Sequence, residues 1–188
     1  MSRTPITALV IIDVQKAILR NPANPRQQET DRALDATVQR IAALLQSARA
    51  SRTPVILVQH DGPPGHRLES GTEGWNLRNE IAPLPNELVF HKRACDAFFE
   101  TGLEAELVRL EIRRLVIAGC MTQYCVDTTV RRAVSLGYDV VLAADGHMTE
   151  DSGGLRFEQI IAHHNGLLNG FDAGAHSVTV APIARIHL

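Results

Sequence analysis

Short apolar runs alternate along the chain with longer segments in which apolar residues recur every three or four positions. The short runs have the length and composition of strands buried on both faces, and the longer segments have the period of amphipathic helices. The predicted strands cover residues 8–14, 55–59, 88–91, 114–118, 139–143 and 177–180. The predicted helices cover residues 28–51, the segment around 103–110, residues 123–136 and residues 155–168.

This alternation predicts an α/β protein with a mostly parallel, doubly wound sheet of about six strands. Helices on both faces give a three-layer αβα, Rossmann-like architecture, which we expect to form one domain over residues 1–188. The segment 60–87 is rich in Gly and Pro, so it is predicted to be a long loop with one short helix around residues 75–81. Loops of this length in compact domains are usually functional.

Composition excludes several classes of protein. A chain of 188 residues, 45% of them hydrophobic, can form a full core without disulfides. The net charge is only -2 and aromatic residues make up 4%, whereas a nucleic-acid-binding protein needs a basic excess or aromatic stacking platforms. No apolar run is long enough to span a membrane. The three cysteines do not suggest a disulfide framework, and the first residues lack a signal-peptide pattern, so we expect a cytoplasmic protein.

Three chemically active side chains follow the carboxyl ends of predicted strands. Asp13 ends the first strand, Lys92 follows the third, and Cys125 follows the fourth after a short turn. Because open α/β sheets bind ligands beyond the carboxyl ends of their strands, we expect these side chains to meet at one edge. Cys125 is the candidate nucleophile, since the first turn of a helix favours a thiolate and can hold an oxyanion. Asp13 is then the candidate base, with Lys92 stabilising both charges.

The sequence also allows plainer interpretations of its thiols and histidines. On position alone, Cys125 could equally be a small apolar residue packed against the sheet. Cys120 directly follows a strand and is expected to shape the turn, while Cys95 has no predicted role. His163 and His164 lie in the middle of a predicted helix, where surface or packing roles are expected.

Three motifs occur in order along the chain: ALVIIDVQ, FHKRACDAFFETGL and LVIAGCMTQYCVDTTVRRAVSLGYDVVLAADG. Together they resemble the isochorismatase-like cysteine hydrolase superfamily, which includes nicotinamidases, N-carbamoylsarcosine amidases and streptothricin hydrolases. The resemblance covers residues 6–180. It implies an isochorismatase-like fold, a catalytic triad of Asp13, Lys92 and Cys125, and assembly of this chain into dimers or tetramers.

The resemblance also implies the geometry of the turn that carries the nucleophile. A cis peptide bond is expected at Cys120–Met121. The backbone N–H groups of Met121 and Cys125 are then the expected oxyanion donors.

One motif of the nicotinamidases is altered in this sequence. Their Asp-x-His metal motif follows the second strand, and here the same place reads VQHDGPPGH, with His60 and Asp61 adjacent and in reversed order. One carboxylate and two imidazoles, the second from His66, would suit zinc. The expectation is nevertheless that the protein binds no metal and no other cofactor, which makes metal-independent relatives the better comparison.

Five residues near the same edge are predicted to contact a small-molecule substrate: Gln15, His60, Trp75, Phe98 and Tyr124. Solvated or structural roles remain open for Gln15 and His60, and a subunit contact remains open for Trp75.

The predicted function is hydrolysis of an amide or related C–N bond of a small molecule through a thioester. Two alternatives stay open. One is isochorismatase-type cleavage of a vinyl ether, which does not need the thiol. The other is a catalytically silent, redox-sensing protein in which Cys120 and Cys125 pair or oxidise in sequence.

Overall fold

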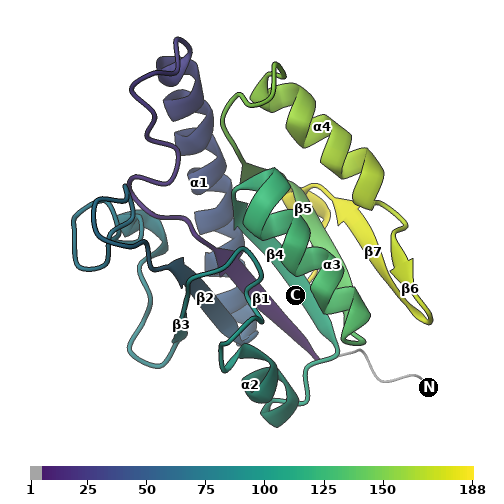
Figure 1. Ribbon diagram of the computed structural model, residues 1–188. Coiled ribbons are helices and arrows are strands. Elements are labelled where there is room, and N and C mark those ends of the chain that lie inside the picture. Colours follow the sequence, from purple (N-terminus) through teal and green to yellow (C-terminus); the bar gives the residue numbers. More distant parts are fainter. Residues whose placement is uncertain (1–5) are drawn as a thin grey trace.

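The computed structural model describes residues 6–188 as a seven-stranded sheet with helices on both faces (Figure 1). The strands are β1 (Thr7–Ile12), β2 (Val55–His60), β3 (Leu88–Lys92), β4 (Arg114–Cys120), β5 (Asp139–Met148), β6 (Asp172–Ala173) and β7 (His176–Ala181). The α-helices are α1 (Gln27–Ser51), α2 (Leu103–Arg109), α3 (Asp127–Ser135) and α4 (Phe157–Leu168). Short helical turns are η1 (Asn79–Ile81), η2 (Thr122–Val126), which has π-helical hydrogen bonds, and η3 (Ile183–Arg185).

The strand order is β3-β2-β1-β4-β5-β7-β6, and every pair is parallel except β6 and β7. From β1 the chain moves outward to β2 and β3, and it then returns to the other side of β1 with β4. The order therefore reverses between β1 and β4. In doubly wound sheets, ligands bind at the carboxyl ends of the strands at such a reversal.

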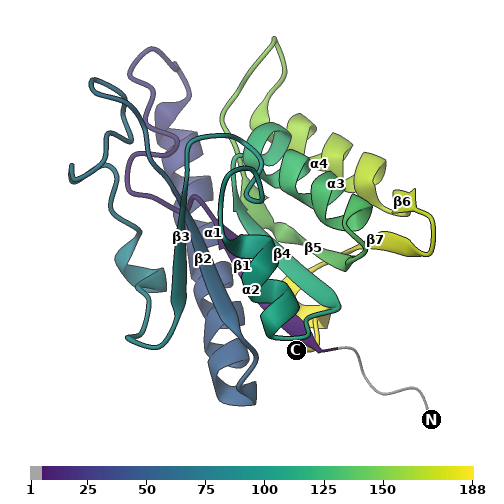
Figure 2. The same cartoon turned by 60° about the horizontal axis from the view of Figure 1, so that its bottom comes forward.

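The central strands are buried on both faces because alternate side chains enter two separate cores. Leu9 and Ile11 of β1 belong to the cluster that packs against α1. Val10 and Ile12 belong to the cluster that contains residues of α2 and α3. Figure 2 shows α1 on one side of the sheet and α2 and α3 on the other. This two-sided burial explains why the strands are continuous apolar runs rather than alternating ones.

The predicted α/β architecture is confirmed, with three differences in detail. The sheet has a seventh strand, β6, whose two residues are too short to produce a periodic signal. β5 continues to Met148, well past the predicted end at residue 143. The short helix predicted over 75–81 is reduced to η1, because the carbonyl of Trp75 accepts hydrogen bonds from the Gln15 and Gln59 side chains rather than from a helical N–H. Among residues 6–188, no helix is long and apolar enough to cross a lipid bilayer.

Candidate active site

Asp13 follows β1 directly and has an unusual backbone conformation. Its φ is +51°, in the left-handed region that costs a non-glycine residue about 1 kcal/mol or more. The Asp13 N–H donates to the carbonyl of Val58 at 2.8 Å, which ties the end of β1 to β2. This conformation ends the strand at Ile12 and places a fully buried carboxylate at the edge of the sheet.

Gly119 lets the end of β4 approach β1 closely. Its φ is +130°, and a Cβ atom there would overlap the carbonyl oxygen of Ile12. Only glycine can therefore occupy this position without displacing β1. One residue later, the Cys120–Met121 peptide bond is cis, as the resemblance implied, and Cys125 follows in η2.

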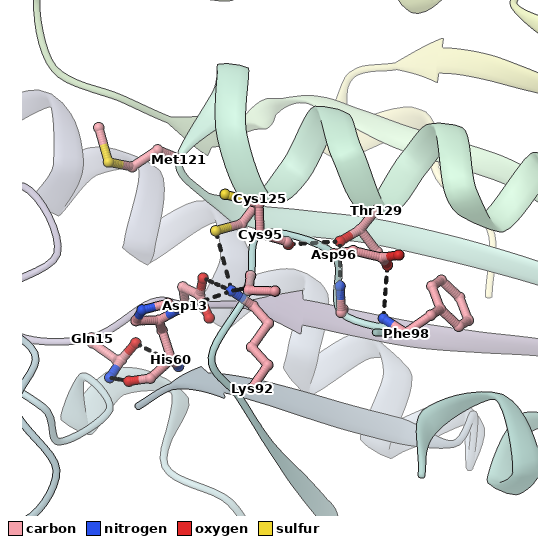
Figure 3. Close-up of polar contacts among 12 residues, drawn as sticks. Asp13, Gln15, His60, Lys92, Cys95, Asp96, Phe98, Met121, Cys125 and Thr129 are labelled. Atoms are coloured by element: carbon pink, nitrogen blue, oxygen red, sulfur yellow. Dashed lines mark hydrogen bonds and ion pairs between the residues drawn. The ribbon is translucent and has the colours of Figure 1, made fainter. Parts of the chain in front are cut away.

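Lys92 joins the acid and the thiol (Figure 3). Its Nζ donates to Asp13 Oδ2 at 2.6 Å, to Cys125 Sγ at 3.1 Å and to the carbonyl of Ala94 at 3.0 Å. The side chains of Lys92 and Asp13 are both 0% exposed, and Cys125 is 8% exposed. Asp13 Oδ1 is also buried and has no hydrogen-bond partner. The three predicted catalytic side chains thus come from three separate elements and meet in a water-poor cluster, an arrangement consistent with a catalytic triad.

The charges in this cluster follow from burial and mutual contact. Burial raises the pKa of Asp13, although the Lys92 ammonium opposes this. Burial works against the charge of Lys92 as well, but the neighbouring Asp13 and Cys125 outweigh it, so the pKa of Lys92 is raised. Burial and the Asp13 charge raise the pKa of the Cys125 thiol, with Lys92 acting in the opposite direction.

Two opposing influences act on the Cys125 thiol. The start of a helix favours a thiolate, whereas burial and the nearby Asp13 raise the pKa of the thiol. Asp13 and Lys92 form a buried ion pair beside the sulfur. A carboxylate in this position can accept the thiol proton when Cys125 reacts.

Two hollows lie near the carboxyl ends of β2 and β3. One, of about 520 Å³, includes His60, and the other, of about 430 Å³, includes Lys92. Asp61 and Arg93 line both hollows, whereas Asp13 and Cys125 line neither. Volumes of this size suit small molecules, but only Lys92 of the three triad residues borders them.

Comparison with known proteins is consistent with this geometry. Residues 7–159 match the family described as Isochorismatase domain.

The chain belongs to the isochorismatase family.

Similar proteins include a hydrolase and an amidohydrolase. A streptothricin hydrolase from Streptomyces noursei is 38% identical over 147 residues, which cover 78% of this chain and 51% of the relative. A ureidoacrylate amidohydrolase from Stutzerimonas stutzeri is 28% identical over 211 residues, covering 94% of this chain and 84% of that protein. This isochorismatase-family chain thus spans about half the length of the streptothricin hydrolases that it matches.

Solved structures share the whole fold. The crystal structure of an isochorismatase from Pseudomonas putida KT2440 superimposes with a TM-score of 0.85 at 30% sequence identity. The match covers 99% of this chain and 94% of the other.

In this family member, the buried Gln15 amide makes three hydrogen bonds within the protein. Its Nε2 donates to the carbonyls of His60 at 3.0 Å and Trp75 at 2.8 Å, and its Oε1 accepts from the His60 N–H at 3.0 Å. Gln15 therefore fastens the long loop 60–87 to the end of β2. Both amide donors are engaged and the residue is 0% exposed, so these contacts support the structural role that the sequence left open.

Trp75 lies against the end of β3 rather than beside the sulfur. Its indole N–H donates to Asp61 Oδ1 at 2.8 Å, and its ring stacks on His91 with centroids 5.6 Å apart. His91 Nδ1 lies 3.0 Å from the same Asp61 oxygen. Trp75 thereby orients Asp61, which lines both hollows. Trp75 itself lines neither hollow, so it would influence a bound ligand through Asp61.

His60 is half-buried and contacts the cluster directly. Its Nδ1 lies 3.4 Å from Lys92 Nζ, and burial together with the Lys92 charge lowers its pKa to about 4. The His60 and His66 rings are 5.9 Å apart, while Asp61 is engaged by Trp75. Within residues 6–188, no three His, Cys, Asp or Glu side chains converge in a way that could hold a metal ion. The absence of a cofactor stays a prediction.

The remaining predicted residues differ in their surroundings. Phe98 is buried in the core and stacks on Tyr138, and its N–H donates to Asp96 Oδ1 (Figure 3). Phe98 lines neither of the two hollows. Tyr124 is 47% exposed on η2, and the Met121 side chain points away from Lys92. The oxyanion role of the Met121 and Cys125 N–H groups stays a prediction.

Two residues that support the cluster were missed by sequence reasoning. The carbonyl of Ala94 accepts a hydrogen bond from Lys92, and Thr129 Oγ1 accepts one from the Ala97 N–H at 3.1 Å. A backbone carbonyl carries no signal in the sequence. Thr129 could have been found, since it lies one helical turn after Cys125 on the same face.

Proposed function

We propose that this protein is a cysteine hydrolase that cleaves an amide or related C–N bond of a small molecule through a thioester. The observation that carries the proposal is the contact of Lys92 Nζ with both Asp13 Oδ2 and Cys125 Sγ in a buried cluster. The similarity to a streptothricin hydrolase and a ureidoacrylate amidohydrolase supports the same reaction class. The physiological substrate lies beyond the proposal.

In the first half of the proposed reaction, Cys125 Sγ attacks the substrate carbonyl carbon while Asp13 takes the thiol proton. The developing oxyanion is held by the backbone N–H groups of Met121 and Cys125. When the C–N bond breaks, Asp13 returns its proton to the departing nitrogen, which leaves as ammonia or an amine. A thioester on Cys125 remains.

In the second half, water attacks the thioester carbonyl and gives a proton to Asp13. The C–S bond then breaks, and Asp13 passes the proton to the sulfur, so the thiol is restored and an acid is released. The raised pKa of Asp13 suits a group that must hold a proton briefly. Lys92 stays positively charged throughout and orients both partners, as the middle residue of a triad does.

The cysteine pair argues against the redox alternative. Cys120 is buried in the cluster that faces α1, and Cys125 is buried in the cluster that faces α3. The two side chains therefore lie on opposite faces of the sheet, where direct pairing needs the turn between them to rearrange. The expected assembly into dimers or tetramers stays a prediction.

The test is release of ammonia, amine or acid from a panel of amides, carbamoyl compounds and lactams. We expect the Cys125→Ala variant to lose turnover by about 10⁴-fold or more, and a rapidly quenched reaction to show an acyl mass on Cys125. The exposed Cys95 provides a matched control, since Cys95→Ala keeps full turnover. Full turnover of these compounds by Cys125→Ala would refute the thioester mechanism, and cleavage of a vinyl ether by that variant would favour the alternative reaction, which does not need the thiol.

A further inference from the structure

A buried histidine behind the nucleophile turn has no part in the mechanism above. His147 of β5 is 1% exposed and lies opposite Gly119 in the register of β4 and β5. Its Nδ1 is 2.9 Å from the hydroxyl of Thr122, the first residue of η2, and its Nε2 is 2.9 Å from Asn165 Oδ1 on α4. The imidazole therefore connects the turn that carries Cys125 to two other elements.

The donor and the acceptor of each of these hydrogen bonds can be assigned by starting from Asn165. Asn165 Nδ2 donates to the carbonyl of Ala144 at 2.9 Å, so Asn165 Oδ1 is the acceptor that faces His147. His147 must then carry its proton on Nε2. Burial lowers the pKa of His147, so the ring is neutral and its Nδ1 is an acceptor. The Thr122 hydroxyl is left as the donor to Nδ1.

Thr122 is also only 1% exposed, so solvent water cannot replace His147 as the partner of its hydroxyl. Because a buried hydroxyl without a hydrogen bond is unfavourable, positions of the turn that keep this bond are favoured. Three residues later in the same turn, Cys125 Sγ lies 3.1 Å from Lys92 Nζ. A shift of η2 moves the sulfur relative to the ammonium and the carboxylate.

We propose that His147 is a positioning residue, which holds η2 through Thr122 so that the Cys125 sulfur stays in contact with Lys92. The catalytic consequence rests on the proposed hydrolase function, whereas the effect on the sulfur does not. Asn165 and the Ala144 carbonyl set the direction of the chain of hydrogen bonds. The unusually long β5, which continues to Met148, is what brings the histidine beside β4.

The first experiment compares Thr122→Val, which has nearly the same shape but no hydroxyl, with Thr122→Ser, which keeps the hydroxyl. Misplacement of a reacting group by about 1 Å can cost about 100-fold in rate. With the compound of the amide panel that the wild type hydrolyses fastest, we therefore expect kcat to fall about 10- to 100-fold in the valine variant, with KM changed less than about twofold, and to recover in the serine variant. A wild-type kcat in Thr122→Val would overturn the proposal.

A second pair separates positioning from loss of folding. The amide of His147→Asn can take the place of Nδ1, and that of His147→Gln the place of Nε2, so both variants leave one of the two contacts. If the link to Thr122 matters, the asparagine variant keeps the higher kcat, and the reverse order would contradict the proposal. The control is His164→Gln on α4, because the hydrogen bond of His164 goes to Ile160 of its own helix and η2 is not involved.

A substrate-free measurement distinguishes this inference from the proposed function. Nuclear magnetic resonance of the full chain reports the Lys92 Nζ and Cys125 Cβ environments directly. We expect both resonances to move in Thr122→Val and to stay at wild-type positions in Thr122→Ser and His164→Gln. Unchanged resonances in the valine variant would refute the positioning role even if hydrolysis is established. Shifted resonances without hydrolytic activity would instead refute only the proposed function.

Discussion

Replacing Lys92 by methionine removes the cation at the centre of the cluster while keeping the length of the side chain. In the wild type, Lys92 Nζ and Asp13 Oδ2 are 2.6 Å apart, and neither side chain is exposed. Their attraction at an effective dielectric constant of 20 is about 6 kcal/mol, and removing one partner of a buried pair usually costs about 3–5 kcal/mol in folding free energy. We expect Lys92→Met to lower the free energy of unfolding by about 3–5 kcal/mol at pH 8.

The loss should depend on pH because Asp13 can neutralise itself by taking up a proton. Without Lys92, which lowers it, the folded-state pKa of Asp13 rises further above its ordinary value of 3.8. A raised pKa means that the folded state binds the proton more tightly, so the contribution of Asp13 to the variant's stability is fully present below pH 3.8 and is lost as pH rises through the folded pKa. The destabilisation relative to wild type should therefore be smaller at pH 5 than at pH 8.

Urea unfolding followed by circular dichroism at the two pH values measures this difference. Lys16→Met is the matched control, because Lys16 forms an exposed ion pair with Glu73 at 3.6 Å and should change stability by less than about 1 kcal/mol. The double variant Asp13→Asn/Lys92→Met should be more stable than either single variant, since it leaves no buried charge unpaired. Equal losses in Lys92→Met and Lys16→Met, or strictly additive losses in the double variant, would refute the reasoning.

Three further predictions follow from single residues. Gly119→Ala should destabilise the fold by more than about 4 kcal/mol in urea unfolding, because its Cβ would overlap β1. Gly166→Ala in α4 should instead stabilise the fold by about 0.5–1 kcal/mol, because the added Cβ meets open space. Iodoacetamide at pH 7.5 should modify the exposed Cys95 in the folded protein. It should modify Cys120 only after unfolding, because Cys120 is buried and burial raises its pKa to about 12. Modified Cys120 in the mass spectrum of a native sample would contradict this prediction. His60 should stay neutral from pH 5 to pH 8 in a nuclear magnetic resonance titration, and a midpoint near 6.5 would contradict its contact with a buried cation.

Most of the architecture could be predicted from the sequence because its causes are local. A strand buried on both faces needs a continuous apolar run, and a helix on a sheet needs an apolar stripe, so both leave periodic patterns. β6 left none, because two residues cannot show a period. The placement of Asp13 and Cys125 was also predictable, since the carboxyl ends of parallel strands necessarily share one edge.

The tertiary structure decided what those residues do to one another. The raised pKa of Cys125 depends on burial and on a carboxylate that lies far away in the sequence, and neither can be seen in the residues around the thiol. Gln15 and Phe98 have side chains that suit a pocket, but three hydrogen bonds tie the amide to residues of the loop, and the ring packs in the core. His147 and Thr122 are adjacent only because β5 pairs with β4.

The sequence by itself thus determined the order of the elements, the sheet they form and the edge at which the acid, the amine and the thiol gather. Periodicity and strand direction are properties of short segments, so they can be recognised in the sequence without knowledge of the tertiary structure. Protonation states, hydrogen-bond partners and the direction of each side chain depend on which distant segments exclude water from a given atom. Only the packed fold, with β1 and β4 brought together at Gly119, decides those.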